Sequence, residues 1–303
     1  MKVFVTGASG FIGSHITQSL LERNHQVAIL VMPKDPMTRL KLLNGHYDVI
    51  NSTLEDTEIL EKSINAFQPE ACIHLAWYAE PGKYLDSVQN IRSLTSSLAL
   101  FQTLIKAGCR QIVGAGTCFE YDTDFGYLQE DTPARPVSLY AAAKLSCYLL
   151  GTQLANQAKT AFAWGRIFYP YGPLEDQRRL VPAAIKALKQ GTPFPASAGE
   201  QIRDYIHVSD VASAFCALME NQADGVFNIA TGRPVSVRQL LEIVAQLMKR
   251  PDLIRLGALP PRSWEPPFIS GNNTRLKSLG WTPSLSLWDG LSETINSMQK
   301  IMD

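Results

Sequence analysis

The chain has 303 residues, 46% hydrophobic and 18% charged, and its 28 basic and 28 acidic side chains cancel. A chain of this length can bury one large hydrophobic core or two smaller ones. Because its charges balance, it has no overall positive potential that would attract nucleic acid or an anionic membrane. No apolar run reaches the roughly 18 residues that span a bilayer, and no cleavable signal pattern opens the chain. Five scattered cysteines without a C-x-x-C pair favour reduced thiols over a disulfide frame or a zinc site. We therefore expect a cytoplasmic protein without a nucleic-acid, membrane or metal partner.

The first predicted element is an apolar strand at residues 3–6 that runs into Gly7, Gly10 and Gly13 and then into a helix from about residue 14. At such a junction, backbone N–H groups and the helix N-terminus point at one spot, where a phosphate satisfies them. Gly7 permits the tight turn, Gly10 lets a pyrophosphate approach the backbone, and Gly13 lets the helix close onto the strand. The turn therefore predicts a dinucleotide site at the start of a strand–helix unit.

The first half of the chain alternates short apolar runs with helical stretches. Predicted strands lie at residues 3–6, 26–31, 47–51, 71–76, 111–115 and 161–168. Predicted helices lie at residues 14–23, 57–67, 88–107 and 139–158. This alternation predicts an α/β fold, a Rossmann domain with a doubly wound parallel sheet that helices cover on both faces.

Proline density separates the second half, because twelve of the eighteen prolines follow residue 160. Helices are predicted there at residues 181–190, 208–220 and 237–249, within otherwise irregular chain. We expect a dinucleotide-binding Rossmann domain over residues 1–165 and a smaller C-terminal substrate-binding lobe over residues 166–303. Within the lobe, about residues 203–220 are expected to return to the Rossmann sheet.

Two sets of residues in the first half are candidates for chemistry. Tyr140 and Lys144 are four residues apart on a predicted helix, so the phenol and the ammonium share a face. The ordinary pKa of tyrosine is roughly 10, and a neighbouring cation favours the phenolate, which can move a proton to or from a hydroxyl; a solvated surface pair is the alternative. Thr117 favours the chemical interpretation, because it follows a predicted strand and ligands bind at the carboxyl ends of such strands. Its hydroxyl could hold the oxygen whose proton Tyr140 handles.

These features, together with the later segment Gln201-Ile-Arg-Asp-Tyr-Ile-His-Val-Ser-Asp-Val, resemble the extended short-chain dehydrogenase/reductase family. More narrowly, the chain resembles its nucleotide-sugar epimerase/dehydratase/reductase branch. The resemblance implies that Tyr140 transfers a proton, that Lys144 binds the nicotinamide ribose and lowers the tyrosine pKa, and that Thr117 bonds the reacting hydroxyl or ketone. The implied cofactor contacts are Gly7, Ser9, Gly10, Phe11, Ile12, Gly13, Leu54, Leu75, Ala76, Tyr140 and Lys144.

The resemblance also implies a nucleotide-diphosphate sugar as substrate. Leu180 and Val181 match the segment that lies against the nucleotide base, and Arg203 and Arg262 match the arginines that clamp the diphosphate. A guanidinium suits this role because it offers a planar fork of donors to phosphate oxygens. Tyr169 stands where many relatives have an asparagine near the sugar. The implied substrate contacts are Thr117, Tyr169, Leu180, Val181, Arg203 and Arg262.

The residues after Thr117 depart from the family pattern. Dehydratases of the branch carry an Asp-Glu pair there, and the epimerising reductases that make fucose precursors carry a cysteine two positions later. This chain has Cys118 and Phe119 instead. We therefore predict reduction of a 4-keto nucleotide sugar by NAD(P)H, with Tyr140 protonating the new alkoxide. The alternatives are a 4-epimerase that uses the same residues, a non-catalytic NAD(P)-sensing protein, and a relative that acts on flavonoid or steroid ketones.

The end of the second predicted strand bears on the choice of cofactor. NAD-binding relatives place an acid there for the adenosine ribose hydroxyls, and this chain has Val31. Nothing at that position repels a 2′-phosphate, and Lys34 or Arg39 could reach one, although no arginine directly follows the strand. We predict NADP in preference to NAD. The family's pairing of the helices predicted at 88–107 and 139–158 further implies a homodimer.

Overall fold

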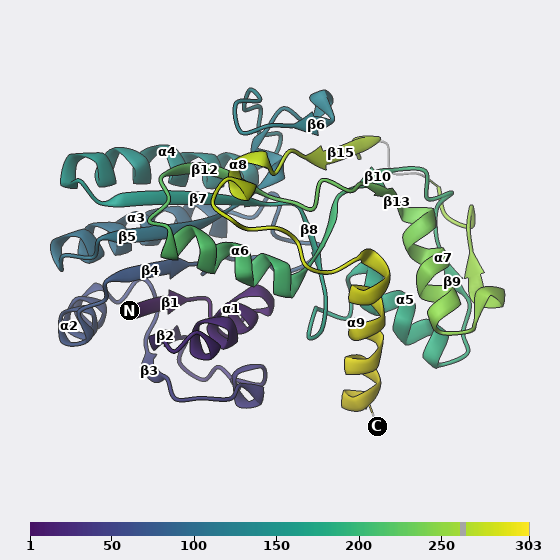
Figure 1. Ribbon diagram of the computed structural model, residues 1–303, viewed down its shortest axis with the longest axis horizontal. Helices are drawn as coiled ribbons and strands as arrows, with labels where there is room; N and C mark the ends of the chain where they lie inside the picture. The colour runs from purple at the N-terminus through teal and green to yellow at the C-terminus, as the bar shows by residue number, and fades with distance from the viewer. Residues whose placement is uncertain (261–264, 303) are drawn as a thin grey trace.

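The computed structural model describes residues 1–260 and 265–302 and places a large parallel sheet beside a smaller lobe (Figure 1). The sheet has seven strands, all parallel, in the order β12-β7-β5-β4-β1-β2-β3. Their bounds are β1 Lys2–Thr6, β2 Gln26–Val31, β3 Asp48–Asn51, β4 Ala71–His74, β5 Gln111–Thr117, β7 Ala161–Ile167 and β12 Gly225–Ile229. The chain runs outward from β1 to β3 and then resumes on the other side of β1 at β4. This order is that of a doubly wound parallel sheet, so the predicted fold class is confirmed. In such sheets, dinucleotides bind where the strand order reverses.

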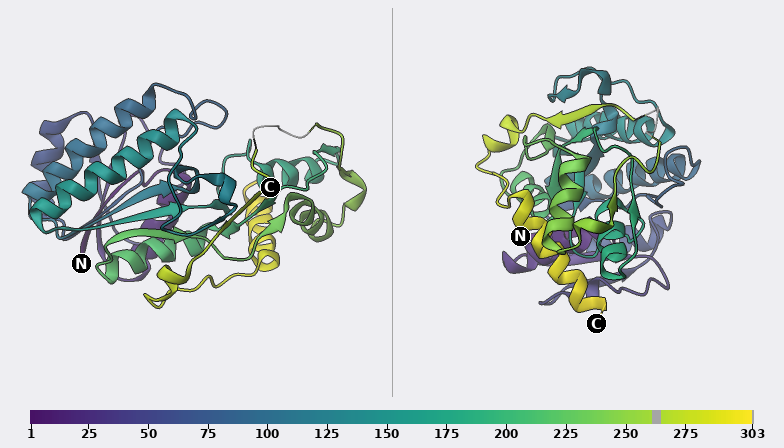
Figure 2. Two further views of the ribbon diagram at one scale, coloured as in Figure 1. Left: turned by 90° about the horizontal axis from the view of Figure 1, so that it is seen from above. Right: turned by 90° about the vertical axis from the view of Figure 1, so that its right-hand side faces the viewer.

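Helices cover both faces of this sheet (Figure 2, left panel). The helices of the two layers are α1 Phe11–Glu22 and α6 Val208–Glu220 on one face, and α2 Thr57–Phe67, α3 Gln89–Lys106 and α4 Leu139–Ala158 on the other. Successive strand residues point to opposite faces, so neighbours on β1 enter different cores. Val5 packs in one core with Ile16 and Phe215, whereas Phe4 packs in the other with Phe101. The continuous apolar runs seen in the sequence are therefore strands buried on both faces.

The lobe is built from short strands and three longer helices around a separate core (Figure 1). Its four-stranded sheet has the order β13-β10-β15-β6, with bounds Val235–Ser236, Ile202–Arg203, Phe268–Gly271 and Tyr127–Leu128. Two strand pairs join β8 Tyr169–Tyr171 to β11 Tyr205–His207 and β9 Phe194–Pro195 to β14 Ile254–Arg255. The helices of the lobe segment are α5 Leu180–Lys189, α7 Val237–Leu247, α8 Thr274–Lys277 and α9 Leu287–Met302. Short 3₁₀ turns lie at Leu40–Leu42, Cys118–Glu120, Thr123–Phe125 and Pro251–Leu253.

The segment expected to return to the sheet, about residues 203–220, divides between the two parts. Strand β10 pairs within the lobe, whereas α6 packs against the Rossmann sheet beside α1. The strand that joins the large sheet comes next, at β12, where it extends the edge next to β7. The sequence analysis did not predict β12 because its five residues lie between a helix and a glycine-containing turn without a longer apolar run.

In the part of the chain that the structure describes, no helix is both long and apolar enough to cross a membrane. Over the same residues, no group of three or more His, Cys, Asp or Glu side chains is arranged to hold a metal ion.

Candidate active site

The glycine-rich turn lies at the carboxyl end of β1, pressed against the segment after β4. Gly7 has a φ of +71°, and a Cβ atom there would lie 2.7 Å from the backbone nitrogen of Ala76. A Cβ on Gly13 would lie 2.0 Å from the carbonyl oxygen of Gly7, so α1 can start this close to the strand only with glycine. Gly10 occupies the N-cap of α1 and has no side chain to satisfy the first N–H groups of the helix. These donors fit the pyrophosphate of a dinucleotide.

A buried histidine fixes the neighbouring strand end. Thr6 Oγ1 lies 2.7 Å from His74 Nδ1, and His74 Nε2 lies 2.8 Å from Ser97 Oγ. Burial lowers the pKa of His74 to about 3, so the imidazole is neutral and bridges two hydroxyls. Thr6 Oγ1 also accepts from the backbone N–H of Ala76 at 3.3 Å. The structure thus brings the predicted contact Ala76, with Leu75 before it, next to the glycine-rich turn.

Thr117 is the last residue of β5 and begins the 3₁₀ turn that follows. Its side chain accepts from the backbone N–H of Phe119 at 3.4 Å, while the side chain of Glu120 accepts from the backbone N–H of Thr117 at 2.8 Å. This reciprocal arrangement is a capping box. The side chain of Thr117 also lies beside the phenol of Tyr140, near enough to influence the pKa of that phenol. The structure therefore joins the two residues that the sequence analysis placed in one reaction centre.

Tyr140 and Lys144 lie in the first two turns of α4, which Ser138 caps by accepting from the N–H of Ala141. Tyr140 meets the ring of Tyr84 edge-on, with centroids 4.8 Å apart. Burial, and then the neighbouring Tyr84, raise the pKa of Tyr140 above its ordinary value, although the hydrogen bond with the Thr117 hydroxyl opposes them. Tyr140 therefore stays protonated at neutral pH, which differs from the expected lowering of its pKa.

Lys144 is buried, and its ammonium group is held away from solvent by two contacts. Its Nζ donates to the carbonyl oxygen of Ala115 at 2.7 Å and lies 3.9 Å from the centroid of the Trp77 ring. Burial lowers the pKa of Lys144 to about 8. Trp77 is fixed in turn by its indole N–H, which donates to Asn90 at 2.8 Å. Trp77 is a site residue that the sequence analysis missed, since it comes directly after the predicted Leu75–Ala76 contact with no motif of its own.

The lobe contributes an aromatic and cationic wall. Tyr169 meets Phe119 edge-on at 6.2 Å between centroids, and the guanidinium of Arg203 lies 5.4 Å from the Tyr169 ring centroid. Arg203 is almost fully buried and lies 3.6 Å from the carboxylate of Glu265. Its predicted partner Arg262 lies outside the described residues. A diphosphate bound by Arg203 would therefore share this guanidinium with the carboxylate of Glu265.

The segment predicted to hold the nucleotide base forms the start of α5. Leu180 is half-buried, and Val181 is buried in the core of the lobe. A contact between Val181 and a base would therefore come from its backbone. Among the predicted cofactor contacts, Leu54 follows β3 and packs against the core under α2 and α3.

Cys118 is buried with Phe168 and Tyr121, and burial raises its pKa to about 12. A thiol held protonated in an apolar pocket is a poor base.

A carboxylate that the sequence analysis did not count lies beside the glycine-rich turn. Asp35, four residues beyond Val31, accepts from Ser9 Oγ at 2.7 Å, because the chain turns back at Lys34 with a φ of 68°. Arg39 approaches the same turn and donates to the Ser9 carbonyl at 3.3 Å. Acidic and basic groups therefore both border the region where the adenosine ribose of a dinucleotide would lie.

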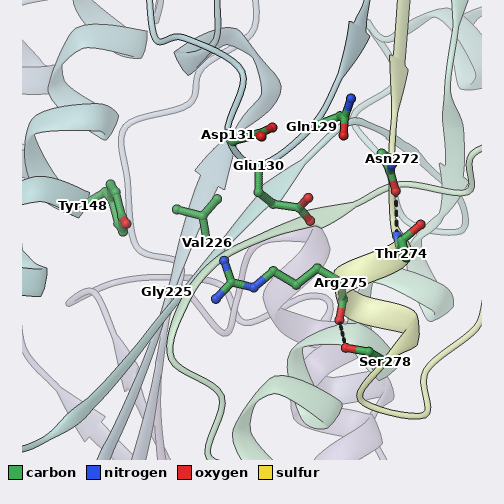
Figure 3. A pocket seen from close by; sticks show the side chains of 10 residues that line it. All are labelled: Gln129, Glu130, Asp131, Tyr148, Gly225, Val226, Asn272, Thr274, Arg275 and Ser278. Atoms are coloured by element: carbon green, nitrogen blue, oxygen red, sulfur yellow. Dashed lines mark hydrogen bonds between the residues drawn. The ribbon is translucent and has the colours of Figure 1, made fainter.

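A hollow of about 580 Å³ lies elsewhere, beside the edge strand β12 (Figure 3). Two of its charged side chains cover that edge: Glu130 accepts from the backbone N–H of Asn228, and Arg275 donates to the carbonyl of Asp224. None of the predicted catalytic or binding residues lines it. The hollow is therefore separate from the candidate active site.

A protein-family model, "NAD dependent epimerase/dehydratase family", matches residues 3–230. The chain belongs to this family. A UDP-glucose 4-epimerase of Corynebacterium glutamicum is 26% identical over 93% of this chain and 91% of its own length. A CDP-abequose synthase of Salmonella typhimurium is 27% identical over 98% of both chains.

Solved structures agree with this assignment. A UDP-glucose 4-epimerase of Thermotoga maritima, crystallised with UDP-glucose, has a TM-score of 0.89 at 27% identity and matches all of both chains. The UDP-glucose 4-epimerase of Thermus thermophilus, solved with NAD, has a TM-score of 0.85 at 25% identity over 99% of both chains. The resemblance to the nucleotide-sugar branch of the extended short-chain dehydrogenases/reductases is confirmed, and the chain is an enzyme of this branch with an NAD(P)-type cofactor.

Proposed function

We propose that the protein reduces the 4-keto group of a nucleotide-diphosphate sugar. The observation that carries the proposal is the contact between Thr117 at the end of β5 and a protonated Tyr140, beside a buried Lys144. Bound NAD(P)H would supply a hydride to the ketone carbon. Tyr140 then donates its proton to the alkoxide that results, while the hydroxyl of Thr117 holds the same oxygen. A phenol that stays protonated near neutral pH suits this direction of proton transfer.

A relative supports the position of the reaction on the sugar. The dTDP-6-deoxy-L-talose 4-dehydrogenase of Aggregatibacter actinomycetemcomitans is 27% identical over 80% of this chain and 88% of its own length. Its name describes oxidation at carbon 4, which is the reverse of ketone reduction there. The diphosphate of the substrate would be held by Arg203 and Arg262, with Tyr169, Leu180 and Val181 along the sugar and the base.

A 4-epimerase is the second candidate, since the relatives from Corynebacterium and Thermotoga carry that name. The same Thr117 and Tyr140 would oxidise the sugar and reduce its opposite face. The absorbance of the reduced cofactor separates the two candidates when a 4-keto nucleotide sugar and, in a parallel assay, a 4-hydroxy nucleotide sugar are supplied. A reductase consumes one NAD(P)H per product, whereas interconversion of two 4-hydroxy sugars with no net change in cofactor would establish the epimerase.

The preference for NADP belongs to the same proposal. It rests on Val31 in the place of an acid and on Arg39, whose guanidinium contacts the carbonyl of Ser9. Asp35 opposes it, because its carboxylate accepts from the Ser9 hydroxyl and would repel a 2′-phosphate. Titration of the protein with each cofactor tests the preference, and binding NAD tenfold more tightly than NADP would contradict it.

We also propose a homodimer paired through α3 and α4. Ile91 on α3 and Leu149 and Leu150 on α4 are large apolar side chains exposed by 47%, 53% and 48%. Large apolar side chains exposed on two helices that pack against each other are candidates for burial in an interface. Sedimentation equilibrium of the wild type and of a Leu149→Glu, Leu150→Glu variant tests this, and a monomeric wild type would contradict it.

A further inference from the structure

A fully buried carboxylate lies directly behind the reaction centre. Glu120 has no exposed surface and follows Thr117 by three residues. Its Oε1 accepts from the backbone N–H of Thr117 at 2.8 Å and from the indole N–H of Trp164 at 3.0 Å, and its Oε2 accepts from Nε of Arg166 at 2.7 Å. Every donor that reaches this carboxylate therefore comes from β5 or from its neighbour β7 in the sheet.

The sheet makes room for this cluster with two glycines. In the register of β5 and β7, Gly114 lies opposite Trp164 and Gly116 lies opposite Arg166. A Cβ atom on Gly116 would lie 2.2 Å from the indole nitrogen of Trp164 and 2.6 Å from Oε1 of Glu120. One on Gly114 would lie 2.3 Å from the Trp164 ring. The alternating glycines before Thr117 therefore clear the space that the indole and the carboxylate occupy.

The side chain of Arg166 is almost as completely buried as that of Glu120. Arg166 is 4% exposed and lies 4.0 Å from the centroid of the Tyr121 ring. Burying two opposite charges costs about as much as their attraction returns, and well-packed apolar residues in their place are often neutral or stabilising. Stability alone therefore gives a weak reason for this pair, whereas a fixed hydrogen bond to the Thr117 backbone has a direct use at the active site.

We infer that Glu120 is a positioning residue, which holds the backbone of Thr117 so that the threonine hydroxyl faces Tyr140 and the reacting oxygen. Trp164 and Arg166 hold the carboxylate in turn, so that its position does not depend on a bound ligand. This inference rests on the role of Thr117 in the proposed function, and it adds a residue that does not touch the substrate.

Two double variants that remove the same pair of charges test the inference. In E120Q/R166Q, the amide oxygen introduced at position 120 can still accept from the Thr117 N–H. The NH₂ group of the same side chain can donate to the amide oxygen introduced at position 166. In E120L/R166L, the acceptor is gone and the space is filled by apolar groups. We expect E120Q/R166Q to keep kcat within about threefold of the wild type, and E120L/R166L to lose about 10- to 100-fold, as displaced catalytic groups do.

The loss should fall on kcat, with the KM for nucleotide sugar and the Kd for cofactor within about twofold of the wild type. The melting temperature of the apolar variant should fall, because the Thr117 N–H and the Trp164 indole N–H lose their acceptor, so kcat is compared at a temperature at which both variants are folded. Equal kcat values for the two variants, or a change confined to KM, would overturn the inference. If E120L/R166L does not fold, E120N/R166Q replaces it: the shorter amide cannot reach the Thr117 N–H, and the same loss of kcat is expected.

Failure of the proposed function would be visible separately. If the wild type turns over no nucleotide sugar, the proposed function fails, and hydrogen exchange at the Thr117 amide then decides the positioning role. We expect slow exchange in the wild type and in E120Q/R166Q, and exchange at least about tenfold faster in E120L/R166L. Equal exchange rates at Thr117 in all three proteins would overturn the inference without any reference to activity.

Discussion

The Rossmann sheet and the lobe hold their parts of the active site in different ways. Strands β5 and β7 are each seven residues long and pair along their whole length, so a continuous ladder extends to Thr117 at the end of β5, where Glu120 accepts from its N–H. In the lobe, β8 with Tyr169 has three residues and β10 with Arg203 has two. Strands this short contribute few backbone hydrogen bonds, and side chains must take over part of the task.

A single buried carboxylate does this in the lobe. Asp204 has no exposed surface and accepts from the N–H and hydroxyl of Thr231 at 2.8 and 2.6 Å, from the N–H of Gly232 at 3.0 Å and from the N–H of Gly271 at 3.1 Å. It thereby ties the end of β10 to the chain after β12 and to β15. In the sheet, regular pairing extends along the strand as far as Thr117 and one local side chain, Glu120, accepts from its N–H, whereas the lobe places Arg203 through a few long-range bonds to Asp204.

The substitution Asp204→Ala should affect the lobe and leave the Rossmann domain unchanged. Removal of the carboxylate leaves several buried donors without an acceptor, so we expect a loss of at least about 3 kcal/mol in the free energy of unfolding of the lobe. Binding of a nucleotide diphosphate should be lost, while NAD(P) binding to the Rossmann domain is kept. Urea unfolding and calorimetry measure both effects, with the exposed Asp252→Ala as the control. If the variant still binds a nucleotide diphosphate, Asp204 does not place Arg203 as described.

Within the Rossmann half, Tyr140→Phe removes the proton donor and leaves the fold intact. We expect turnover to fall at least about 100-fold with cofactor affinity unchanged, which is the usual scale for a positioned acid. Steady-state kinetics and cofactor titration provide the measurement, and Tyr127→Phe, at an exposed site on β6, provides the control. Near-wild-type turnover in the Tyr140 variant would remove this residue from the mechanism.

On the lobe side, Arg203→Ala tests the diphosphate contact. The loss of a charge-assisted hydrogen bond should weaken UDP, TDP or CDP binding by about 10- to 100-fold. Arg178→Ala is the matched control, because that guanidinium is exposed and pairs with Asp176. If calorimetry detects no binding of any nucleoside diphosphate to the wild type, the sugar-nucleotide substrate is wrong.

The smallest expected effect concerns the cofactor. Asp35→Asn removes the negative charge beside Ser9, so the ratio of NADP to NAD affinity should rise by about tenfold, or about 1.4 kcal/mol. Fluorescence titration with both reduced cofactors measures the ratio, and Asp48→Asn, on the exposed edge strand β3, should leave it unchanged. An unchanged ratio in the Asp35 variant would mean that this carboxylate does not face the 2′ position.

The same contrast explains what the sequence could predict. Long apolar strands, the glycine-rich turn and the Tyr140/Lys144 spacing are local patterns, and the structure places each where the pattern indicates. Strand β12 was missed because a five-residue run carries little periodic signal. Glu120 could have been found, since Thr117 followed by a glutamate three residues later is the pattern of a capping box. Asp35 and Trp77 could not, because the position of Asp35 depends on the turn at Lys34 and that of Trp77 on a hydrogen bond to Asn90, 13 residues away on α3.

Isotope transfer shows directly whether a hydride passes from the cofactor to carbon 4 of the sugar. Reduced cofactor deuterated at both positions of nicotinamide carbon 4 is mixed with a 4-keto nucleotide sugar and the wild-type protein, and the product is examined by mass spectrometry and NMR. The account predicts one deuterium per product molecule, bound at carbon 4 of the sugar, with one cofactor oxidised for each product formed. No deuterated product from the 4-keto sugar, with interconversion of 4-hydroxy sugars in a parallel sample that contains a 4-hydroxy nucleotide sugar instead, would contradict the proposed reduction.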